Sequence, residues 1–212
     1  MPKPWNDDPP ESRQQIEANI LALGPQFRAD TESRPAPTVA MAQEWHRALY
    51  AGVKLPEPYY AGEIRDSDPQ FPELYGYEVR VGSALGVPSQ DVPAELAQLE
   101  TRIQAVCSRL DAAIPGGALP PDDATLRAVI AACANAHGEW VRIHPFANGN
   151  GRPARLWVTW IGLRYGLPTF ILVKPRPAGE PYAAAAAASM RGDHRFCALL
   201  FEQMLRAKLG QS

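Results

Sequence analysis

The sequence predicts an all-α protein with one small β element, and two observations carry this prediction. Apolar residues recur at steps of three and four along most of the chain, which is the spacing of amphipathic helices. The 22 prolines gather in intervals that would end and separate such helices, namely 2–10, 35–37, 56–93, 115–121 and 168–181. With 212 residues, the chain is long enough to bury one sizeable core as a single domain.

Each periodic segment between these intervals is expected to form one helix. In the first of them, Ile16, Ile20 and Leu23 fall on the same face. The alanine run that follows Tyr182 has high helix propensity and favours close packing. The predicted helices cover residues 11–23, 38–50, 93–110, 122 to the glycines near 149, 153–166, 182–190 and 193–208.

Residues 55–93 lack this helical period. They mix aromatic residues, prolines and short alternating pieces, and the alternation at 77–82 suits a β-hairpin. We therefore expect a small β-flap or an irregular loop here, and a short extended segment at 169–173.

Composition narrows the class of protein. The formal net charge is -2 and the sequence pI is about 6.1, so no strong positive field favours nucleic acid or an anionic membrane. Cys107, Cys133 and Cys197 stand singly in apolar stretches, which is typical of reduced, structural cysteines. With no apolar run of about 20 residues and no apolar leader, we expect a cytoplasmic protein.

The segment that carries chemistry runs from His144 to Arg155 and joins two predicted helices. The ordinary pKa of histidine, near 6.5, makes His144 a candidate to accept a hydroxyl proton at neutral pH. The sequence Gly149-Asn150-Gly151 permits positive φ, close backbone approach and a free helix N-terminus, all of which favour anions. Arg152 and Arg155 lie three residues apart and can both reach phosphate oxygens.

Each of these features has an ordinary structural explanation when taken alone. A Gly-Asn-Gly turn commonly joins two helices, a single histidine is more often structural than catalytic, and an arginine pair often lies on a solvated face. Phe146 is interpreted as an apolar anchor that pins the turn to the core, and His137 as a buried structural histidine.

Taken together, residues 144–155 read H-P-F-A-N-G-N-G-R-P-A-R, which resembles the Fic family motif H-P-F-x-[D/E]-G-N-G-R-x-x-R at every defined position but one. Seven non-proline matches at average residue usage make a chance occurrence improbable. The resemblance extends to 45–50 and 61–65, and takes in His137 and Tyr182, so that it spans roughly residues 41–205.

This resemblance implies a Fic-type helical bundle with a small β-hairpin flap, and transfer of AMP from ATP with Mg²⁺ or Mn²⁺. The acceptor would be a Ser, Thr or Tyr hydroxyl of a target protein, held in extended form by the flap at 64–81. It implies His144 as the base, Gly149, Asn150 and Gly151 as the anion site, and Arg152 and Arg155 as phosphate ligands. Self-modification and a homo-oligomer are left open.

Asn148 is the departure from the motif, because it occupies the position of the acid that holds the metal. Mg²⁺ usually takes one or two carboxylates together with phosphate oxygens, and an amide keeps a ligand while losing the charge. Three outcomes are weighed: a slow adenylyltransferase, a transferase with another nucleotide or phosphate donor, and a fold kept for binding alone, as in an adaptor or antitoxin-like partner. A nucleic-acid binder and a metallohydrolase are disfavoured.

The N-terminal helix resembles the inhibitory helix of Fic proteins, whose pattern is [S/T]-x-x-x-E-[G/N]. Here Ser12 stands one residue too far from Glu17, and Ala18 replaces Gly or Asn. The resemblance implies that Glu17 pairs with Arg155 and regulates the site; the alternative is a solvated glutamate. It divides the chain into an N-terminal segment, 1–37, and a Fic domain, 38–212.

Overall fold

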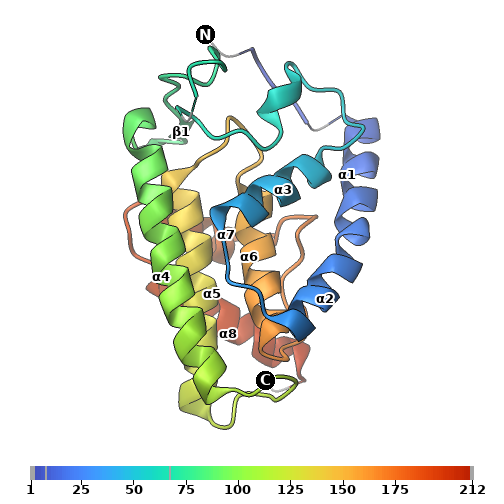
Figure 1. The fold of residues 1–212 in the computed structure, drawn as a ribbon, viewed down its shortest axis with the longest axis vertical. Helices are drawn as coiled ribbons and strands as arrows, with labels where there is room; N and C mark the ends of the chain where they lie inside the picture. Colours follow the sequence, from blue (N-terminus) through green and yellow to red (C-terminus); the bar gives the residue numbers. More distant parts are fainter. Residues whose placement is uncertain (1–2, 8, 67, 211–212) are drawn as a thin grey trace.

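The computed structural model describes residues 3–7, 9–66 and 68–210, and helices make up most of this part of the chain (Figure 1). An antiparallel hairpin joins Arg80–Val81 (β1) to Ala84–Leu85 (β2), with Val81 opposite Ala84. The prediction of an all-α bundle with a small hairpin is therefore confirmed. The α-helices are α1 (Pro10–Ala22), α2 (Gly24–Ser33), α3 (Val39–Leu49), α4 (Val92–Ala113), α5 (Asp123–Ile143), α6 (Gly151–Arg164), α7 (Glu180–Ser189) and α8 (Arg195–Lys208).

Helix α5 is the central element, because it packs against α4, α6, α7 and α8. Its buried residues occupy much of its circumference, as expected for a helix covered on several sides. A cluster of tryptophans ties it to its neighbours: the ring of Trp157 on α6 lies 6.3 Å from that of Trp140 on α5 and 4.8 Å from that of Trp45 on α3. These aromatic contacts fix the relative positions of the three helices that surround the α5–α6 turn.

Local capping explains where the helices around this turn begin and end. The Asp122 carboxylate accepts a hydrogen bond of 2.7 Å from the backbone N–H of Thr125 and starts α5. Helix α5 ends at His144, whose left-handed conformation (φ 56°) stops the helical path. Helix α6 starts at Gly151, and Pro153 lies in its first turn, where its missing N–H costs nothing.

Two segments differ from the sequence prediction. Helix α2 was not expected, because no helix was predicted between 23 and 38, whereas Pro25 lies in the first turn of a second helix. Phe27 supports α2 by packing on Trp45, with 5.1 Å between the rings. The hairpin covers 80–85 and so lies three residues further along the chain than 77–82, with strands of only two residues each. Most of residues 50–90 is irregular apart from the hairpin, Pro58–Tyr60 (η1) and Ser89–Asp91 (η2).

None of the helices in the described part of the chain combines the length and the apolar character needed to cross a membrane.

Candidate active site

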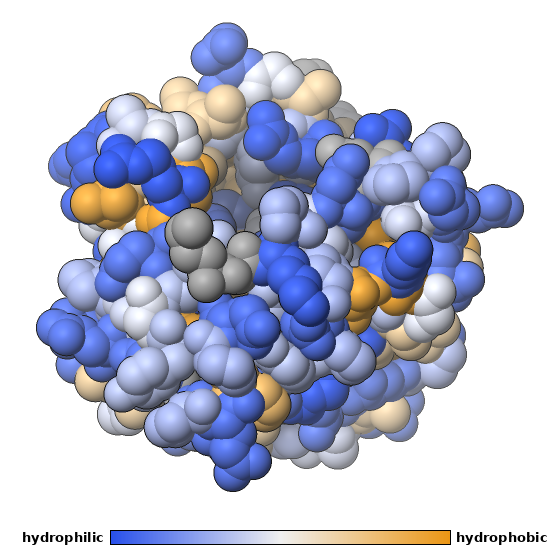
Figure 2. Space-filling view, turned by 90° about the horizontal axis from the view of Figure 1, so that it is seen from above, coloured by the Kyte–Doolittle hydropathy of each residue, from blue (hydrophilic) through white to orange (hydrophobic). Residues whose placement is uncertain are grey.

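The motif forms the turn between α5 and α6, and the hairpin lies at the same end of the bundle, the upper end in Figure 1. Figure 2 views the molecule from this end and shows hydrophilic residues over most of it, with hydrophobic residues in scattered groups. This end therefore lacks a single broad apolar face, and its chemistry depends on polar side chains around the turn.

The turn is braced from its inner side by three residues. Phe146 is fully buried and stacks on the His46 ring, with 3.9 Å between the ring centroids, which agrees with its predicted role as an anchor. Asn150 bonds both backbone groups of Phe146, accepting from its N–H at 2.9 Å and donating to its carbonyl at 2.8 Å. His46 donates from Nε2 to the Asn148 carbonyl at 3.1 Å and accepts from the Gly62 N–H at 2.9 Å.

His46 is consequently held in one neutral tautomer. Burial lowers its pKa to about 3, so the ring carries no charge at neutral pH. The amide of Asn150 and the ring of His46 leave the turn little freedom, because every polar group that they offer is engaged.

His144 is oriented as a base. Its Nδ1 lies 3.1 Å from the Val141 carbonyl, so this nitrogen carries the proton and Nε2 keeps its lone pair. Burial lowers the pKa of His144 to about 4, and the nearby charge of Arg65 acts in the same direction. The imidazole is therefore neutral near pH 7 and able to accept a proton at Nε2.

Arg65 holds the backbone of His144 in place. Its side chain is completely buried and donates from Nε to the His144 carbonyl at 2.9 Å. The same guanidinium donates to Tyr77 and Val87, which flank the hairpin, at 2.5 and 3.0 Å. Arg65 thus connects the hairpin with the end of α5, so that the distance between the flap and His144 is fixed.

The glycines of the turn allow the backbone N–H groups at the start of α6 to be approached closely. Gly149 has φ 76°, and a Cβ atom there would collide with the Tyr50 hydroxyl. Gly151 is the first residue of α6, whose free N–H groups and positive dipole end attract an anion.

Arg152 is engaged by an acidic residue that the sequence analysis did not single out. Its NH1 lies 2.5 Å from Asp7 Oδ2 and 2.5 Å from the Tyr50 hydroxyl, which in turn donates to Asp7 at 2.6 Å. Asp7 is only 8% exposed. Burial alone would raise the pKa of Asp7, but the hydrogen bond from Tyr50 and the charge of Arg152 outweigh it and lower the pKa, so the carboxylate is ionised.

Arg155 has a different environment, made of neutral acceptors. It is 6% exposed and donates from Nε to the Val173 carbonyl at 2.9 Å and from NH1 to the Tyr182 hydroxyl at 3.2 Å. The Tyr182 hydroxyl lies 2.8 Å from Nε2 of His137. Because Tyr182 already accepts from Arg155, it donates to His137, whose pKa burial lowers to about 3. His137 is therefore a buried neutral residue, as predicted, that supports Arg155 through Tyr182.

Asn148 contacts the N-terminal segment. Its Oδ1 accepts from the Gly149 N–H at 2.7 Å, and its Nδ2 donates to the Trp5 carbonyl at 3.2 Å. The Trp5 ring packs on Tyr50, with 4.7 Å between the centroids. Residues 3–7, called here the N-terminal strap, thus cover both Asn148 and Arg152.

The donor set around Asn148 fits a magnesium ion only if a ligand supplies further oxygens. The motif position provides one neutral amide oxygen, and the described residues contain no group of three His, Cys, Asp or Glu side chains placed to hold a metal ion. Mg²⁺ ordinarily keeps several waters and binds through phosphates with one or two protein oxygens, so this small donor set is compatible with a metal–nucleotide complex.

Glu17 does not make the predicted contact with Arg155. It lies on an exposed part of α1, and no ion pair joins the two residues in the described structure, where Arg155 bonds to Val173 and Tyr182 instead. The inhibitory role of Glu17 therefore stays a prediction without support from an existing contact.

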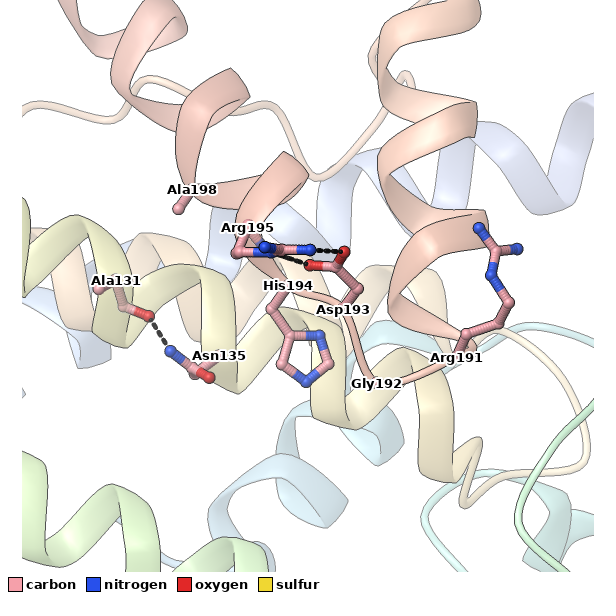
Figure 3. Close-up of a pocket in the computed structure, with 8 residues that line it drawn as sticks. All are labelled: Ala131, Asn135, Arg191, Gly192, Asp193, His194, Arg195 and Ala198. Carbon is pink, nitrogen blue, oxygen red and sulfur yellow. Dashed lines mark hydrogen bonds and ion pairs between the residues drawn. The ribbon is translucent and has the colours of Figure 1, made fainter.

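A hollow lies away from the motif, where the α7–α8 junction meets α5 (Figure 3). Within it, the two side-chain nitrogens of Arg195 bond the Asp193 carboxylate at 3.0 and 2.8 Å, and His194 bonds Glu139 at 2.7 Å. The Arg195 guanidinium in this hollow is therefore neutralised by Asp193.

Sequence reasoning missed the strap and gave no role to His46 and Arg65, although both lie in the segments that carry the family resemblance. Asp7 is 145 positions from Arg152 in the chain, and no periodicity or motif marks an acidic residue in a proline-rich segment as its partner. The groups that His46 and Arg65 bond at the turn, the Asn148 and His144 carbonyls, are distant in the chain, so these two roles are likewise visible only in the folded protein.

The Fic/DOC family model matches residues 36–161, which include the turn and most of the elements that support it. Because this match covers more than half of the sequence, the chain belongs to the Fic/DOC family. Members of this family typically transfer AMP or another nucleotide to proteins. A search of curated protein sequences finds no match.

Solved structures of Fic domains share the fold. The BepC protein of Bartonella tribocorum, with bound AMPPNP, superposes with a TM-score of 0.62 at 18% identity, over 93% of this chain and 87% of that one. Fic-1 of C. elegans has a TM-score of 0.58 at 24% identity, over 99% of this chain and 54% of that one. A Fic domain of a putative cell filamentation protein from Bartonella quintana, with bound ADP, gives 0.55 at 17% identity, over 94% of this chain and 89% of that one.

Proposed function

We propose that the protein is an adenylyltransferase that moves AMP from ATP to a hydroxyl side chain of a target protein. The observation that carries the proposal is the pairing of a neutral base with a phosphate site across one braced turn. His144 has a free Nε2 at one end of the turn, and Arg152 and Arg155 project from the first two turns of α6 at the other. The nucleotide-bound Fic structures support a nucleoside triphosphate as donor.

In this reaction, Nε2 of His144 accepts the proton of the target hydroxyl. The hydroxyl oxygen forms a bond to the α phosphorus, the bond from this phosphorus to the bridging oxygen breaks, and pyrophosphate leaves. Backbone N–H groups of Asn150 and Gly151 and the dipole of α6 stabilise the negative charge of the phosphates. Arg152 and Arg155 bind the β and γ phosphates, which hold the leaving group in place.

A bound Mg²⁺ or Mn²⁺ would neutralise phosphate charge as a Lewis acid. Asn148 is the residue that would hold it, through Oδ1. An amide lacks the negative charge of a carboxylate, so the site binds the metal more weakly than one with an acid at this position. The enzyme is therefore expected to be slow and to need a high metal concentration.

The target segment is proposed to pair with the hairpin. Val81 and Leu85 are 40% and 60% exposed, so each strand offers side chains and backbone to a chain laid beside it. Because Arg65 connects the hairpin with the His144 carbonyl, a hydroxyl on the paired segment would be held at a constant distance from Nε2 of His144.

A specific observation favours a second candidate, a weakly active or binding-only Fic protein. The strap occupies Arg152 with Asp7 and Asn148 with Trp5, and these are residues that ATP and its metal require. In the adenylyltransferase, ATP would displace the Asp7 carboxylate from Arg152. In a binding-only protein, the contact between Asp7 and Arg152 would remain.

Intact-mass measurement of the purified protein with ATP and either metal tests the proposal through self-modification, with added protein substrates as a second arm. We expect a mass increase of one AMP in the wild type, and its loss by roughly 100- to 10,000-fold in His144→Ala, the usual range for a general base. Retained ATP affinity in His144→Ala is the control for folding. Incorporation that is unchanged in His144→Ala, or absent with every nucleotide and both metals, would favour the binding-only protein.

A further inference from the structure

Lys174 has a charged group that is buried without a partner. Its Nζ is inaccessible to solvent and has no hydrogen-bond partner among the described residues. A buried ammonium loses its hydration, and proteins ordinarily compensate this loss with an acceptor or an anion. The missing acceptor at Lys174 therefore requires an explanation.

Lys174 lies beside the residues proposed to bind phosphate. The carbonyl of the preceding residue, Val173, accepts from Arg155 Nε at 2.9 Å, so this part of the chain runs against the beginning of α6. Lys174 also lines the groove between α1, α2 and α6, in which Glu17 stands on the opposite helix. The segment thus places its ammonium between the phosphate site and α1.

The charges around Lys174 agree with this position. Burial lowers the pKa of Lys174, and the positive charges of Arg152 and Arg13 lower it further. The negative charges of Asp7 and Glu17 raise it. Arg152 and Asp7 belong to the site, and Glu17 and Arg13 to α1. A second cation near Arg152 is unfavourable unless an anion of more than one charge joins them.

We propose that Lys174 is a third phosphate-binding cation, which contacts the polyphosphate of a nucleoside triphosphate together with Arg152 and Arg155. The proposal rests on the proposed function, because it places the same phosphates in the same site. Asp7 supplies a single carboxylate to this group of cations in the absence of nucleotide, and the polyphosphate replaces it.

The test is a set of equilibrium dissociation constants for ATP, inorganic triphosphate and AMP, measured by calorimetry on the full chain. Lys174→Met keeps the length and the apolar stem but removes the charge. Lys174→Arg keeps the charge, and Lys208→Met, at an exposed position near the end of α8, is the matched control. Thermal unfolding of each variant verifies that it is folded.

We expect Lys174→Met to weaken the binding of ATP and of inorganic triphosphate by about 10- to 100-fold, the range for a lost charge-assisted hydrogen bond. AMP affinity should stay within about twofold, and Lys174→Arg should restore most of the triphosphate affinity, because only the polyphosphate meets this charge.

The results separate two failures. If the wild type binds ATP and Lys174→Met binds it equally well, the inference about Lys174 is wrong and the proposed function stands. An equal loss of AMP and ATP affinity would also overturn it, because Lys174 would then act on the fold of the pocket. If the wild type binds neither ATP nor inorganic triphosphate, the proposed function and the inference fail together.

Discussion

The two arginines of the turn share one helix but differ in what surrounds them. Arg155 is held by neutral acceptors, Val173 and Tyr182, that belong to the domain core. Arg152 is neutralised by the carboxylate of Asp7, which belongs to the N-terminal strap. The first arrangement leaves the positive charge of the arginine available to a ligand, and the second occupies it.

This difference separates the permanent part of the site from the part that must change. The turn and Arg155 are supported by buried groups on α3, α5 and α7. Under the proposed function, the strap must leave Arg152 and Asn148 when a metal–nucleotide complex binds. The strength of the strap therefore sets how much affinity for ATP is lost before catalysis begins.

Asn148→Asp is expected to have the largest effect of the variants that sharpen this comparison. The aspartate would restore a carboxylate for the metal, and it would lose the donor that bonds the Trp5 carbonyl, so the strap would also loosen. We expect AMP incorporation at limiting Mg²⁺ to rise by about tenfold or more, since a metal contributes several kcal/mol to such a transition state.

Quantitative mass spectrometry at several Mg²⁺ concentrations measures this increase. Asn135→Asp, on an exposed position of α5, is the control for an added charge. Incorporation that is identical in wild type and Asn148→Asp at low Mg²⁺ would show that neither the charge nor the strap limits the reaction.

Asp7→Ala should strengthen ATP binding by roughly tenfold, because Arg152 no longer has to exchange one charge-assisted hydrogen bond for another. The measurement is the ATP dissociation constant by calorimetry, with Glu17→Gly as the paired variant. The family resemblance predicts that Glu17→Gly raises activity, whereas the contacts in the structure assign the larger effect to Asp7. An increase in ATP affinity in Glu17→Gly but not in Asp7→Ala would show that α1, and not the strap, opposes ATP binding.

Tyr182→Phe should weaken ATP binding by about fivefold, the effect of losing one long hydrogen bond, of 3.2 Å, that positions Arg155. The affinity for AMP should not change, because Arg155 is assigned to the β and γ phosphates. Tyr165→Phe removes a hydroxyl that bonds the Cys107 carbonyl and Asp111, which are not part of the site, and serves as the control. Equal losses in the two variants would mean that Tyr182 affects the fold and not the position of Arg155.

The smallest effect on the reaction rate is expected from changing the pH near neutrality. The pKa of His144 is lowered to about 4, so its neutral, proton-accepting form predominates above that pH and is lost as pH falls through it. Single-turnover rates should be nearly constant between about pH 6 and 8 and fall in acid. A tenfold rise in rate over pH 6 to 8 would contradict the burial that keeps this imidazole neutral.

The permanent part of the site was the more predictable of the two. Its sequence is contiguous, so the positions of the base, the glycines and both arginines followed from twelve neighbouring residues and from the helices on either side. Phe146 and His137 were also predicted correctly, because an apolar residue in a polar turn and a histidine on an apolar helix face both indicate burial.

The strap and helix α2 could not be predicted in the same way. Trp5 and Asp7 reach the site through contacts between residues more than 40 positions apart, inside a segment without periodicity. Gly24-Pro25 ends a helix in many sequences and starts one here, and the burial of Phe27 against Trp45 decides between the two. Such choices depend on tertiary packing, which local sequence does not specify.

Labelling with ATP radioactive at either the α or the γ phosphate tests the central claim most directly. AMP transfer retains the α label on protein and releases the γ label with pyrophosphate. We therefore expect α label on wild type, none on His144→Ala, and no γ label on either. Protein that retains the γ label, or that retains α label in His144→Ala as in wild type, would contradict transfer of AMP by the base at His144.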